Sequence, residues 1–350
     1  MKIIIAGSGQ VGSHLAKLLS YESQEITLID SNDEKLTFPN SQLDIRVVEG
    51  DCTSISVLNK ANVTDADLFI GVTAAEAVNL TACYLAKQLG AKKTIARISN
   101  PELKENDNID FSELGISELI SPEILTSKEI NMAINRAEFT DPFEFEGGAL
   151  ITLGLSATHT STFVGKTVVE AAEIFPETHF FPISIKRDEK TIIPRGDTVF
   201  HSGDHIVFMT EPGGEEELLK LSGQNNGVIK NVMILGGGRV GKKVAQDLSS
   251  NNFNVKLVEI DKDRAEELAE DLENCLVIYG DGTNTELLDE ESLDQMDSFI
   301  AVTGDSEDNI MSSLIAKSKG INKTIALVDN LDYYKLTQIS GIDTLINKTF

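Results

Sequence analysis

The sequence predicts an α/β protein in which two doubly wound parallel-sheet domains are separated by a small α+β domain. In two stretches of the 350-residue chain, short apolar runs alternate with segments that carry helical spacing. Strands that are apolar throughout and separated by helices form parallel sheets covered on both faces. The two stretches also share residues in one register, because Gly7 and Gly236 lie 229 positions apart and Asp51 and Asp281 lie 230 apart. The chain therefore carries one structural unit twice.

The first unit is expected to span residues 1–139. Val11, Leu15 and Leu18 recur at helical spacing after the first apolar run. A long crossover helix over 121–139 closes the unit, since Ser121-Pro122-Glu123 puts a proline near the first helical position. The apolar residues of this helix are expected to bridge two domains or two subunits. The predicted strands are 2–6, 25–29, 44–48, 67–72, 94–98 and 116–120.

The second unit is expected over residues 230–350, where the same alternation returns. Its predicted strands are 232–235, 255–258, 276–279, 298–302, 324–328 and 344–346.

The segment between the units, residues 140–221, has a different texture in which strand-like runs dominate. Residues 150–157 and 178–185 read as strands, and 190–193 and 205–210 as a short antiparallel set closed by a turn at 194–197. One helix fits, over 165–174. A flexible linker over 222–229 then leads to the second unit.

Charge and cysteine content exclude several classes of protein. A formal net charge of −26 argues against a nucleic-acid partner, because Lys and Arg provide the affinity for phosphates. That charge is consistent with solubility or a salt-adapted host, and also with docking onto a basic surface. Three cysteines without a C-x-x-C pair indicate a reduced compartment. No run approaches the ~18–20 apolar residues of a membrane span. These features predict a soluble, cytoplasmic protein without direct membrane insertion.

A glycine fingerprint opens each unit and predicts a Rossmann-type phosphate loop. In that loop the first glycine allows a tight turn, the second lets the backbone approach a pyrophosphate, and the third lets helix and strand pack closely. The N-terminus of the helix then offers free N–H groups to phosphate. The candidate contacts are Gly7, Ser8, Gly9, Gln10, Val11 and Gly12 in the first unit and Gly236, Gly238, Arg239, Val240 and Gly241 in the second.

An acid follows each fingerprint at the end of the second strand. Asp30 and Glu259 each lie 18 residues past the third glycine, where a carboxylate can bind the adenosine ribose hydroxyls. A carboxylate there repels a ribose 2′-phosphate, and the next two residues offer no Arg to accept one. The pattern favours NAD(H) or an adenine nucleotide such as ATP or ADP, and makes NADP unlikely.

Further candidates follow the third and fourth strands. Asp51 and Asp281 could accept a hydrogen bond from the adenine amino group, or could simply form a turn. Cys52 follows Asp51 and is included among the candidate contacts, although all three cysteines are expected to pack as small hydrophobes. Thr73 and Thr303 could meet phosphate or ribose, or could cap the next helix.

The two sites are expected to differ in ligand charge or affinity. Arg97 follows the fifth strand as a phosphate or subunit contact, but its counterpart is Leu327. Inside the glycine loop, the residue that corresponds to Gln10 in the second unit is Arg239.

The sequence shows no catalytic constellation. The five histidines do not pair with Cys or carboxylates at metal-ligand spacing. A hydride-transfer enzyme would need a domain that brings an acid or base over the nicotinamide, and an ~80-residue, mostly β segment is small for that role.

These motifs resemble the TrkA family, the cytosolic regulatory subunits of bacterial Trk potassium uptake systems, built from RCK (regulator of potassium conductance) units. The stretches that carry this resemblance are residues 1–12, 47–51, 95–98, 193–197, 203–208 and 300–303. The resemblance implies a non-enzymatic sensor, peripheral to the inner face of the plasma membrane, that forms a homo-oligomer, from dimer to ring. Binding of NAD(H) or ATP/ADP in the crevices would change the shape of the ring and thereby gate a membrane-embedded, TrkH-like potassium transporter subunit.

One departure from the family pattern concerns the end of the chain. The family's order is Rossmann, small RCK C-type domain, Rossmann, small domain, whereas this sequence stops at Phe350. We expect a truncated piece or a shortened family member that keeps nucleotide binding. Two alternatives stay open: an NAD-dependent oxidoreductase, and a nucleotide-sensing regulator of another cation transporter, such as an antiporter.

Overall fold

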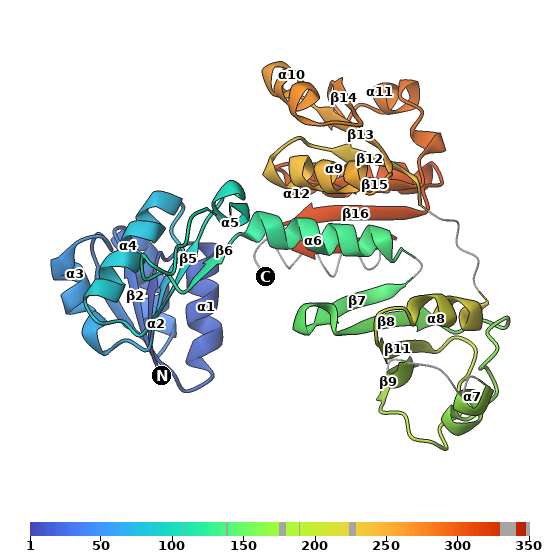
Figure 1. Ribbon diagram of the computed structural model, residues 1–350, viewed down its shortest axis with the longest axis horizontal. Helices are drawn as coiled ribbons and strands as arrows, with labels where there is room; N and C mark the ends of the chain where they lie inside the picture. The colour runs from blue at the N-terminus through green and yellow to red at the C-terminus, as the bar shows by residue number, and fades with distance from the viewer. Residues whose placement is uncertain are drawn as a thin grey trace. The chain divides into compact units, whose positions relative to one another are not determined.

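The computed structural model describes residues 1–106, 108–137, 139–174, 180–188, 190–223, 229–329 and 341–347. The chain divides into two compact units, Met1–Thr126 with Asn347–Phe350, and Ser127–Ile346. The first holds a six-stranded sheet, and the second holds a five-stranded sheet and another six-stranded sheet (Figure 1).

The first sheet is parallel, with strand order β3-β2-β1-β4-β5-β6. Successive residues of β1 enter different layers, because Ile3 and Ile5 pack with helices α1 and α2 while Ile4 and Ala6 pack with α3 and α4. This is the doubly wound arrangement that the sequence predicts, and its order reverses at β1 and β4. The elements are β1 (Lys2–Ala6), α1 (Gln10–Ser20), β2 (Glu25–Asp30), α2 (Asp33–Gln42), β3 (Arg46–Glu49), α3 (Ile55–Lys60), the 3₁₀ helix η1 (Val63–Asp65), β4 (Leu68–Gly71), α4 (Glu76–Gln88), β5 (Lys93–Arg97), α5 (Glu102–Glu105), β6 (Glu118–Ile120) and α6 (Pro122–Asn135).

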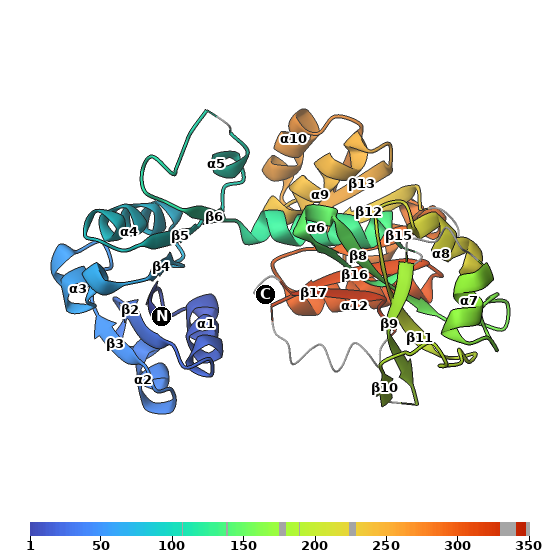
Figure 2. The same ribbon diagram turned by 60° about the horizontal axis from the view of Figure 1, so that its bottom comes forward.

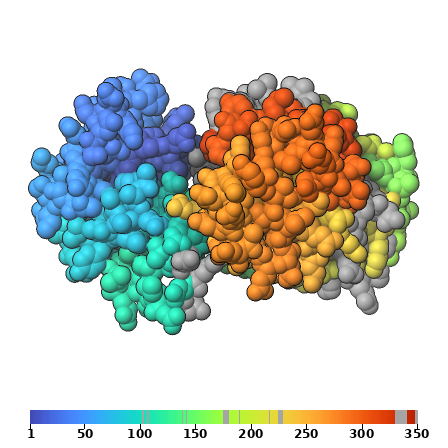
Figure 3. Space-filling model, turned by 90° about the horizontal axis from the view of Figure 1, so that it is seen from above, coloured from blue at the N-terminus to red at the C-terminus, as the bar shows by residue number. Residues whose placement is uncertain are grey.

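The second six-stranded sheet repeats this topology, with strand order β14-β13-β12-β15-β16-β17. The surface view in Figure 3 shows the first repeat in blue to cyan and the second in orange to red. Its elements are β12 (Asn231–Leu235), α9 (Arg239–Ser250), β13 (Asn254–Glu259), α10 (Lys262–Asp271), β14 (Cys275–Tyr279), α11 (Thr285–Glu290), η3 (Leu293–Gln295), β15 (Ser298–Ala301), α12 (Ser306–Ser318), β16 (Lys323–Val328) and β17 (Thr344–Asn347).

The small domain is a sheet with strand order β10-β9-β11-β8-β7 and antiparallel pairing throughout (Figure 2). Its core contains the edge-to-face ring pair Phe163 and Phe200. The elements are β7 (Thr140–Phe145), η2 (Glu146–Gly148), β8 (Leu150–Ser156), α7 (Val168–Ile174), β9 (Phe180–Arg187), β10 (Lys190–Ile192), β11 (His205–Thr210) and α8 (Glu215–Ser222).

The small domain differs from the sequence prediction in three details. Strand β7 was not expected, because Pro142 and two acids interrupt its apolar pattern. A second helix, α8, is present, and Ser222, predicted to begin the linker, is its buried last residue. Strand β10 pairs with β9 rather than with the 205–210 strand. Residues 178–179 of the predicted 178–185 strand and residues 224–228 of the predicted linker lie outside the described residues.

Helix α6 begins at Pro122, as the sequence predicts. Its residues Ile130, Ala133 and Ile134 are buried in the same cluster as Val244 and Leu248 of α9. That cluster also contains residues of β16 and β17, so α6 covers part of one face of the second sheet. The expectation that this helix bridges two domains or two subunits stays a prediction; the described residues show its C-terminal half packed on the second repeat.

Candidate functional site

The glycine loop between β1 and α1 has the geometry expected from the roles of its three glycines. Gly7 has a φ of +109°, and a Cβ there would lie 2.9 Å from the Thr73 nitrogen. A Cβ on Gly12 would lie 1.8 Å from the Gly7 carbonyl oxygen, so only glycine allows this approach of helix and strand. A Cβ on Gly9 would meet nothing within 4 Å. The loop therefore closes tightly at both ends and leaves its middle open.

The loop between β12 and α9 has the same geometry. Gly236 has a φ of +101°, and a Cβ on Gly241 would lie 1.9 Å from the Gly236 carbonyl oxygen. A Cβ on Gly238 would meet nothing within 4 Å. In both repeats the first and third glycines are closely packed, and the middle glycine is open.

The helix that follows each loop begins without a side-chain cap. Gly9 and Gly238 are the N-cap residues of α1 and α9, and neither can cap the first-turn N–H groups with a side chain. Gln10 and Arg239 come next and are exposed. Val11 is half-buried and Val240 is buried, so these two side chains pack rather than face a ligand. Each helix N-terminus therefore presents backbone N–H groups and the positive end of the helix dipole, which suit an anion.

The two acids face the glycine loops and hold them. Asp30 accepts from the Ser8 N–H at 2.7 Å and from the Asn32 N–H at 2.9 Å. Glu259 accepts at the same distances from the N–H groups of Gly237 and Asp261. Because an ionised carboxylate has about four acceptor sites, each acid can still accept from ribose hydroxyls. The acids thus have a positioning role that the sequence did not indicate.

Asp51 and Asp281 form turns. Asp51 Oδ1 accepts from the N–H and the hydroxyl of Thr53, at 2.8 and 2.7 Å, and Asp281 binds Thr283 in the same way. These hydrogen bonds hold the pKa of both carboxyls below its ordinary value. The turn-forming alternative is therefore present at both positions, and an adenine contact stays a prediction.

Cys52 lies in the hydrophobic core of the first repeat. It is 6% exposed, and burial raises the pKa of its thiol to about 11. Its counterpart is Gly282, where a Cβ would come within 2.1 Å of Leu235. The thiol packs as a small hydrophobe, so only the backbone of Cys52 could contact a ligand.

Thr73 and Thr303 follow the fourth strands, β4 and β15, and are each held by a buried asparagine. Asn79 Oδ1 accepts from the Thr73 N–H and hydroxyl at 2.8 and 2.7 Å, and Asn79 Nδ2 donates to the Thr73 and Arg97 carbonyls. Asn309 makes the same four contacts, with Thr303 and with the Leu327 carbonyl. The asparagines thus fix the carboxyl ends of two neighbouring strands, β4 and β5 or β15 and β16, beside the point where strand order reverses.

The two sites differ in their cations. Arg97 lies at the end of β5, and its Nε is buried without a hydrogen-bond partner. The corresponding Leu327 is buried in the core. In the second repeat, Arg264 Nε donates to the Gly237 carbonyl at 3.3 Å, which places a guanidinium beside the loop that Glu259 holds. In the first repeat the Ser8 hydroxyl instead donates to the Lys35 carbonyl at 2.9 Å.

The sequence prediction does not include Arg264, because it rests on the two residues directly after Glu259. Its position in the first turn of α10 was the available signal, since that turn follows the acid directly. The two loops thus differ in more cations than the sequence indicates, and a difference in ligand charge or affinity stays a prediction. Which of all these residues touch a bound nucleotide stays a prediction.

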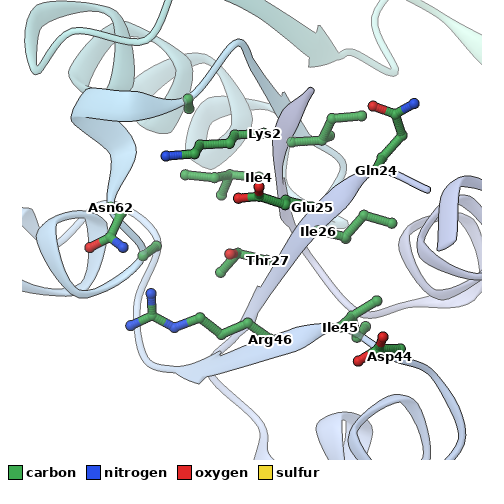
Figure 4. Close-up of a pocket in the computed structure, with 13 residues that line it drawn as sticks. Lys2, Ile4, Gln24, Glu25, Ile26, Thr27, Asp44, Ile45, Arg46 and Asn62 are labelled. Carbon is green, nitrogen blue, oxygen red and sulfur yellow. The ribbon is translucent and has the colours of Figure 1, made fainter.

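A separate pocket lies at the amino ends of β1, β2 and β3, away from the glycine loop (Figure 4). Its volume is about 370 Å³, and Thr27 and Arg46 line it. Strand register places Thr27 beside Arg46, whereas the matching pair in the second repeat is Lys256 and Leu276. Arg46 and Lys256 each donate to a backbone carbonyl. In the first repeat the cation, Arg46, therefore lies on the edge strand β3, whereas in the second repeat the cation, Lys256, lies on the inner strand β13. The short side chain of Thr27 leaves the pocket open.

The described residues contain no cluster of three or more His, Cys, Asp or Glu that could hold a metal ion. None of the helices they form is both long and apolar enough to cross a membrane.

The fold and the paired loops define the class of protein. It consists of two Rossmann-type domains, each with an open glycine cradle and a facing acid, and a small antiparallel domain that lies between them in sequence.

Comparison with known proteins identifies the family. Residues 3–122 and 232–348 match the TrkA-N domain, and residues 155–223 match the TrkA-C domain. The Trk system potassium uptake protein TrkA of Haemophilus influenzae is 37% identical over 353 residues, which cover 99% of this chain and 76% of that protein. The TrkA homolog 2 of Methanosarcina mazei is 33% identical, with coverage of 99% and 78%. The chain belongs to the TrkA family and spans about three quarters of the length of these relatives.

Solved structures support the fold. The GsuK channel bound to NAD matches with a TM-score of 0.73 at 19% identity, over 99% of this chain and 61% of that one. GsuK bound to ADP matches with a TM-score of 0.61 at 15% identity, with coverage of 99% and 66%.

Proposed function

We propose that this chain is a nucleotide-sensing regulatory subunit of a potassium uptake system, acting without catalysis on a membrane-embedded transporter. The observation that carries the proposal is the duplicated cradle, in which an open glycine, an uncapped helix N-terminus and a loop-holding acid recur in both repeats. The names of the relatives support the potassium uptake system.

The ligand that suits each cradle is NAD(H) or an adenine nucleotide. The open middle glycine leaves room for a pyrophosphate, and the helix N-terminus favours its charge. Asp30 and Glu259 are then available to the ribose hydroxyls and disfavour a 2′-phosphate. The titles of two fold neighbours, bound to NAD and to ADP, are consistent with both ligand classes.

Sensing requires that the ligand distinguish two conformations of the assembly. A nucleotide shifts a conformational equilibrium only by its difference in affinity for the two states. Helix α9 begins at the second cradle and packs on α6, which leads into β7 of the small domain. A nucleotide that moved α9 would therefore act on the small domain through one helix. We infer that an oligomeric, ring-like assembly on the cytoplasmic face of the transporter reads this movement.

The central test separates binding from folding. Gly9→Ala and Gly238→Ala each put a methyl group into open space at a backbone conformation that alanine adopts, so both variants should fold normally. Each methyl group would occupy the phosphate position, and we expect at least about tenfold weaker binding at one site. Titration calorimetry with NADH and with ATP measures this effect. Thr27→Ala, at the opposite end of the first sheet, is the matched control.

Two outcomes would contradict the proposal. Unchanged affinity in both glycine variants would remove the cradles as nucleotide sites. NADH consumption by the purified protein with small carbonyl substrates, followed by absorbance, would favour the oxidoreductase alternative. Potassium uptake in cells that lack their own copy of the chain tests the regulatory role, since the double glycine variant should lose the response to nucleotide while the protein still accumulates.

A further inference from the structure

The pocket at the amino ends of β1, β2 and β3 is lined from one face of the first sheet. Strand register places Lys2 beside Glu25. It also places Thr27 between Ile4 on β1 and Arg46 on β3. Side chains alternate between the two faces of a sheet along each strand, so residues paired across strands share a face. These five side chains therefore stand in two adjacent rows, with the buried Ile4 as an apolar floor.

One side of the pocket carries hydrogen-bond donors, two of them cationic. Arg46 donates to the Lys60 carbonyl at 2.5 Å, which holds the guanidinium beside the pocket and leaves most of its five N–H groups available. The Lys2 ammonium lies 3.4 Å from the Asp65 carboxylate, in an exposed ion pair of the kind that contributes little. Asn62, in the left-handed turn after α3 with a φ of 57°, adds an amide.

The other side carries acceptors that have no partner of their own. In Figure 4 the nitrogens of Lys2 and Arg46 lie toward Asn62. The side-chain oxygens of Glu25 and Thr27 lie over β2 instead. Within the described ranges, neither the Glu25 carboxylate nor the Thr27 hydroxyl makes a hydrogen bond or an ion pair. Both signs of charge thus border one space of about 370 Å³.

The second repeat fills the corresponding positions with contacts of its own. Asn231 and Asn254 take the register positions of Lys2 and Glu25, and they are joined by a hydrogen bond of 2.9 Å. Lys256, in the place of a threonine, donates to a carbonyl at the end of a helix at 2.6 Å. The first repeat instead leaves a carboxylate and a hydroxyl beside a cavity, as a site for a ligand would.

The charges around the pocket favour a ligand that carries both signs. A simple anion would lie beside the Glu25 carboxylate, and a simple cation would lie beside Lys2 and Arg46. A molecule with one ammonium group and one carboxylate meets both sets with opposite charge. Because such a molecule has no net charge, the net charge of −26 on the chain does not repel it as it would repel an anion.

We propose that this pocket binds a small zwitterion of amino-acid size, with a primary ammonium group and a carboxylate. The ligand carboxylate accepts from Arg46 and Asn62, and the ligand ammonium group donates to Glu25 and Thr27. The pocket volume is at the low end of the usual range for ligand pockets, which suits a short carbon chain lying on Ile4. Exposed ion pairs are weak, so we expect a dissociation constant of roughly 0.1–10 mM. Binding at this site does not depend on nucleotide in either cradle.

The first experiment follows the pocket in the intact chain by NMR of isoleucine δ1 methyl groups. Ile4 reports on the pocket, and Ile234 of β12 is the reference in the second repeat. Glycine, β-alanine and γ-aminobutyrate are titrated up to roughly 50 mM, several times the weakest dissociation constant expected. At least one of them should shift the Ile4 signal in a saturable way and leave the Ile234 signal unchanged. Butyrate and butylamine, which each lack one charged group of γ-aminobutyrate, should bind at least about tenfold more weakly than the best zwitterion.

The second experiment changes the pocket itself. Glu25→Gln removes the charged partner of the ammonium group and should weaken binding of the best zwitterion roughly tenfold. Glu22→Gln removes the same charge outside the pocket and should leave the affinity unaltered. Thr27→Lys with Arg46→Leu copies the second repeat, where Lys256 reaches the end of a helix, and should abolish binding.

Three results would overturn the site: an Ile4 signal that none of the three zwitterions shifts, butyrate or butylamine bound as tightly as the zwitterions, or an unchanged affinity in Glu25→Gln. Calorimetry with NADH on the same variants keeps this result separate from the proposed function. Lost zwitterion binding with normal NADH binding supports the site, and loss of both would contradict a separate pocket. Normal zwitterion binding in a chain that binds no NADH would contradict the sensor role alone.

Discussion

Asn79 should be the most sensitive buried polar residue of the first repeat, and Asn79→Leu tests this expectation. Its side chain is 1% exposed and makes four hydrogen bonds to the ends of β4 and β5. Leucine has a similar volume but leaves the Thr73 N–H and the Thr73 and Arg97 carbonyls without their partner. Each unpaired group costs about 1–2 kcal/mol in this partly buried setting, and burial of the leucine side chain offsets about 2 kcal/mol. Three such groups cost about 3–6 kcal/mol, so the net loss should be about 1–4 kcal/mol, centred near 2.5 kcal/mol.

Hydrogen exchange followed by mass spectrometry is the assay, because it measures each repeat separately in the intact chain. A loss of about 2.8 kcal/mol corresponds to roughly hundredfold faster exchange in the core peptides of β1, β4 and β5. Peptides of the second repeat should not change. Asn309→Leu should produce the reciprocal pattern, because Asn309 makes the same contacts. Asn59→Leu, on the exposed side of α3, should change neither repeat.

The result that would refute this reasoning is a folded Asn79→Leu variant whose first-repeat peptides exchange at the wild-type rate. In that case the four hydrogen bonds would contribute little beyond what water supplies to the same groups.

Three further predictions concern the loops, the small domain and the pocket. Gly12→Ala should prevent normal folding of the first repeat, since its Cβ would lie 1.8 Å from a carbonyl oxygen, whereas Gly9→Ala should keep the wild-type circular dichroism and melting temperature. In the small domain, burial would raise the pKa of the Asp204 carboxyl, but its hydrogen bonds to Arg187 and the His201 N–H outweigh burial and hold that pKa below 3.8. The ionised Asp204 carboxylate therefore contributes its full share of the free energy of unfolding above about pH 4, and this share is lost as the pH falls through the lowered pKa of the folded state. Asp204→Asn should lower the urea midpoint of unfolding at pH 7. In this variant the midpoint should also decline less steeply below pH 4. Thr27→Lys with Arg46→Leu copies the second repeat into the pocket and should leave NADH affinity unchanged by calorimetry, while an altered affinity would contradict the separation of pocket and cradle.

The sequence was sufficient for features that depend on local backbone geometry. The apolar runs predict the two parallel sheets because strands buried on both faces have no polar side to alternate. The roles of Gly7 and Gly12 follow from spacing, since a strand, a tight turn and a helix leave no room for a Cβ at those points.

The features that sequence reasoning missed depend on contacts between distant elements. Arg264 reaches the Gly237 carbonyl only because α10 folds back beside the loop. Strand β7 was missed because it draws its stability from pairing with β8 rather than from an apolar pattern of its own.

The packing of α6 on the second sheet has a consequence for how this chain can be divided. Ile130 and Ile134 belong to the first repeat in sequence but to the core of the second in space. A fragment that starts at residue 230 would lose the burial of these two side chains, roughly 3–6 kcal/mol by transfer free energies. It would also uncover the apolar surface that they protect on α9. We therefore expect the second repeat alone to be less stable than in the whole chain, and a fragment that begins at the start of α6 would keep this surface covered.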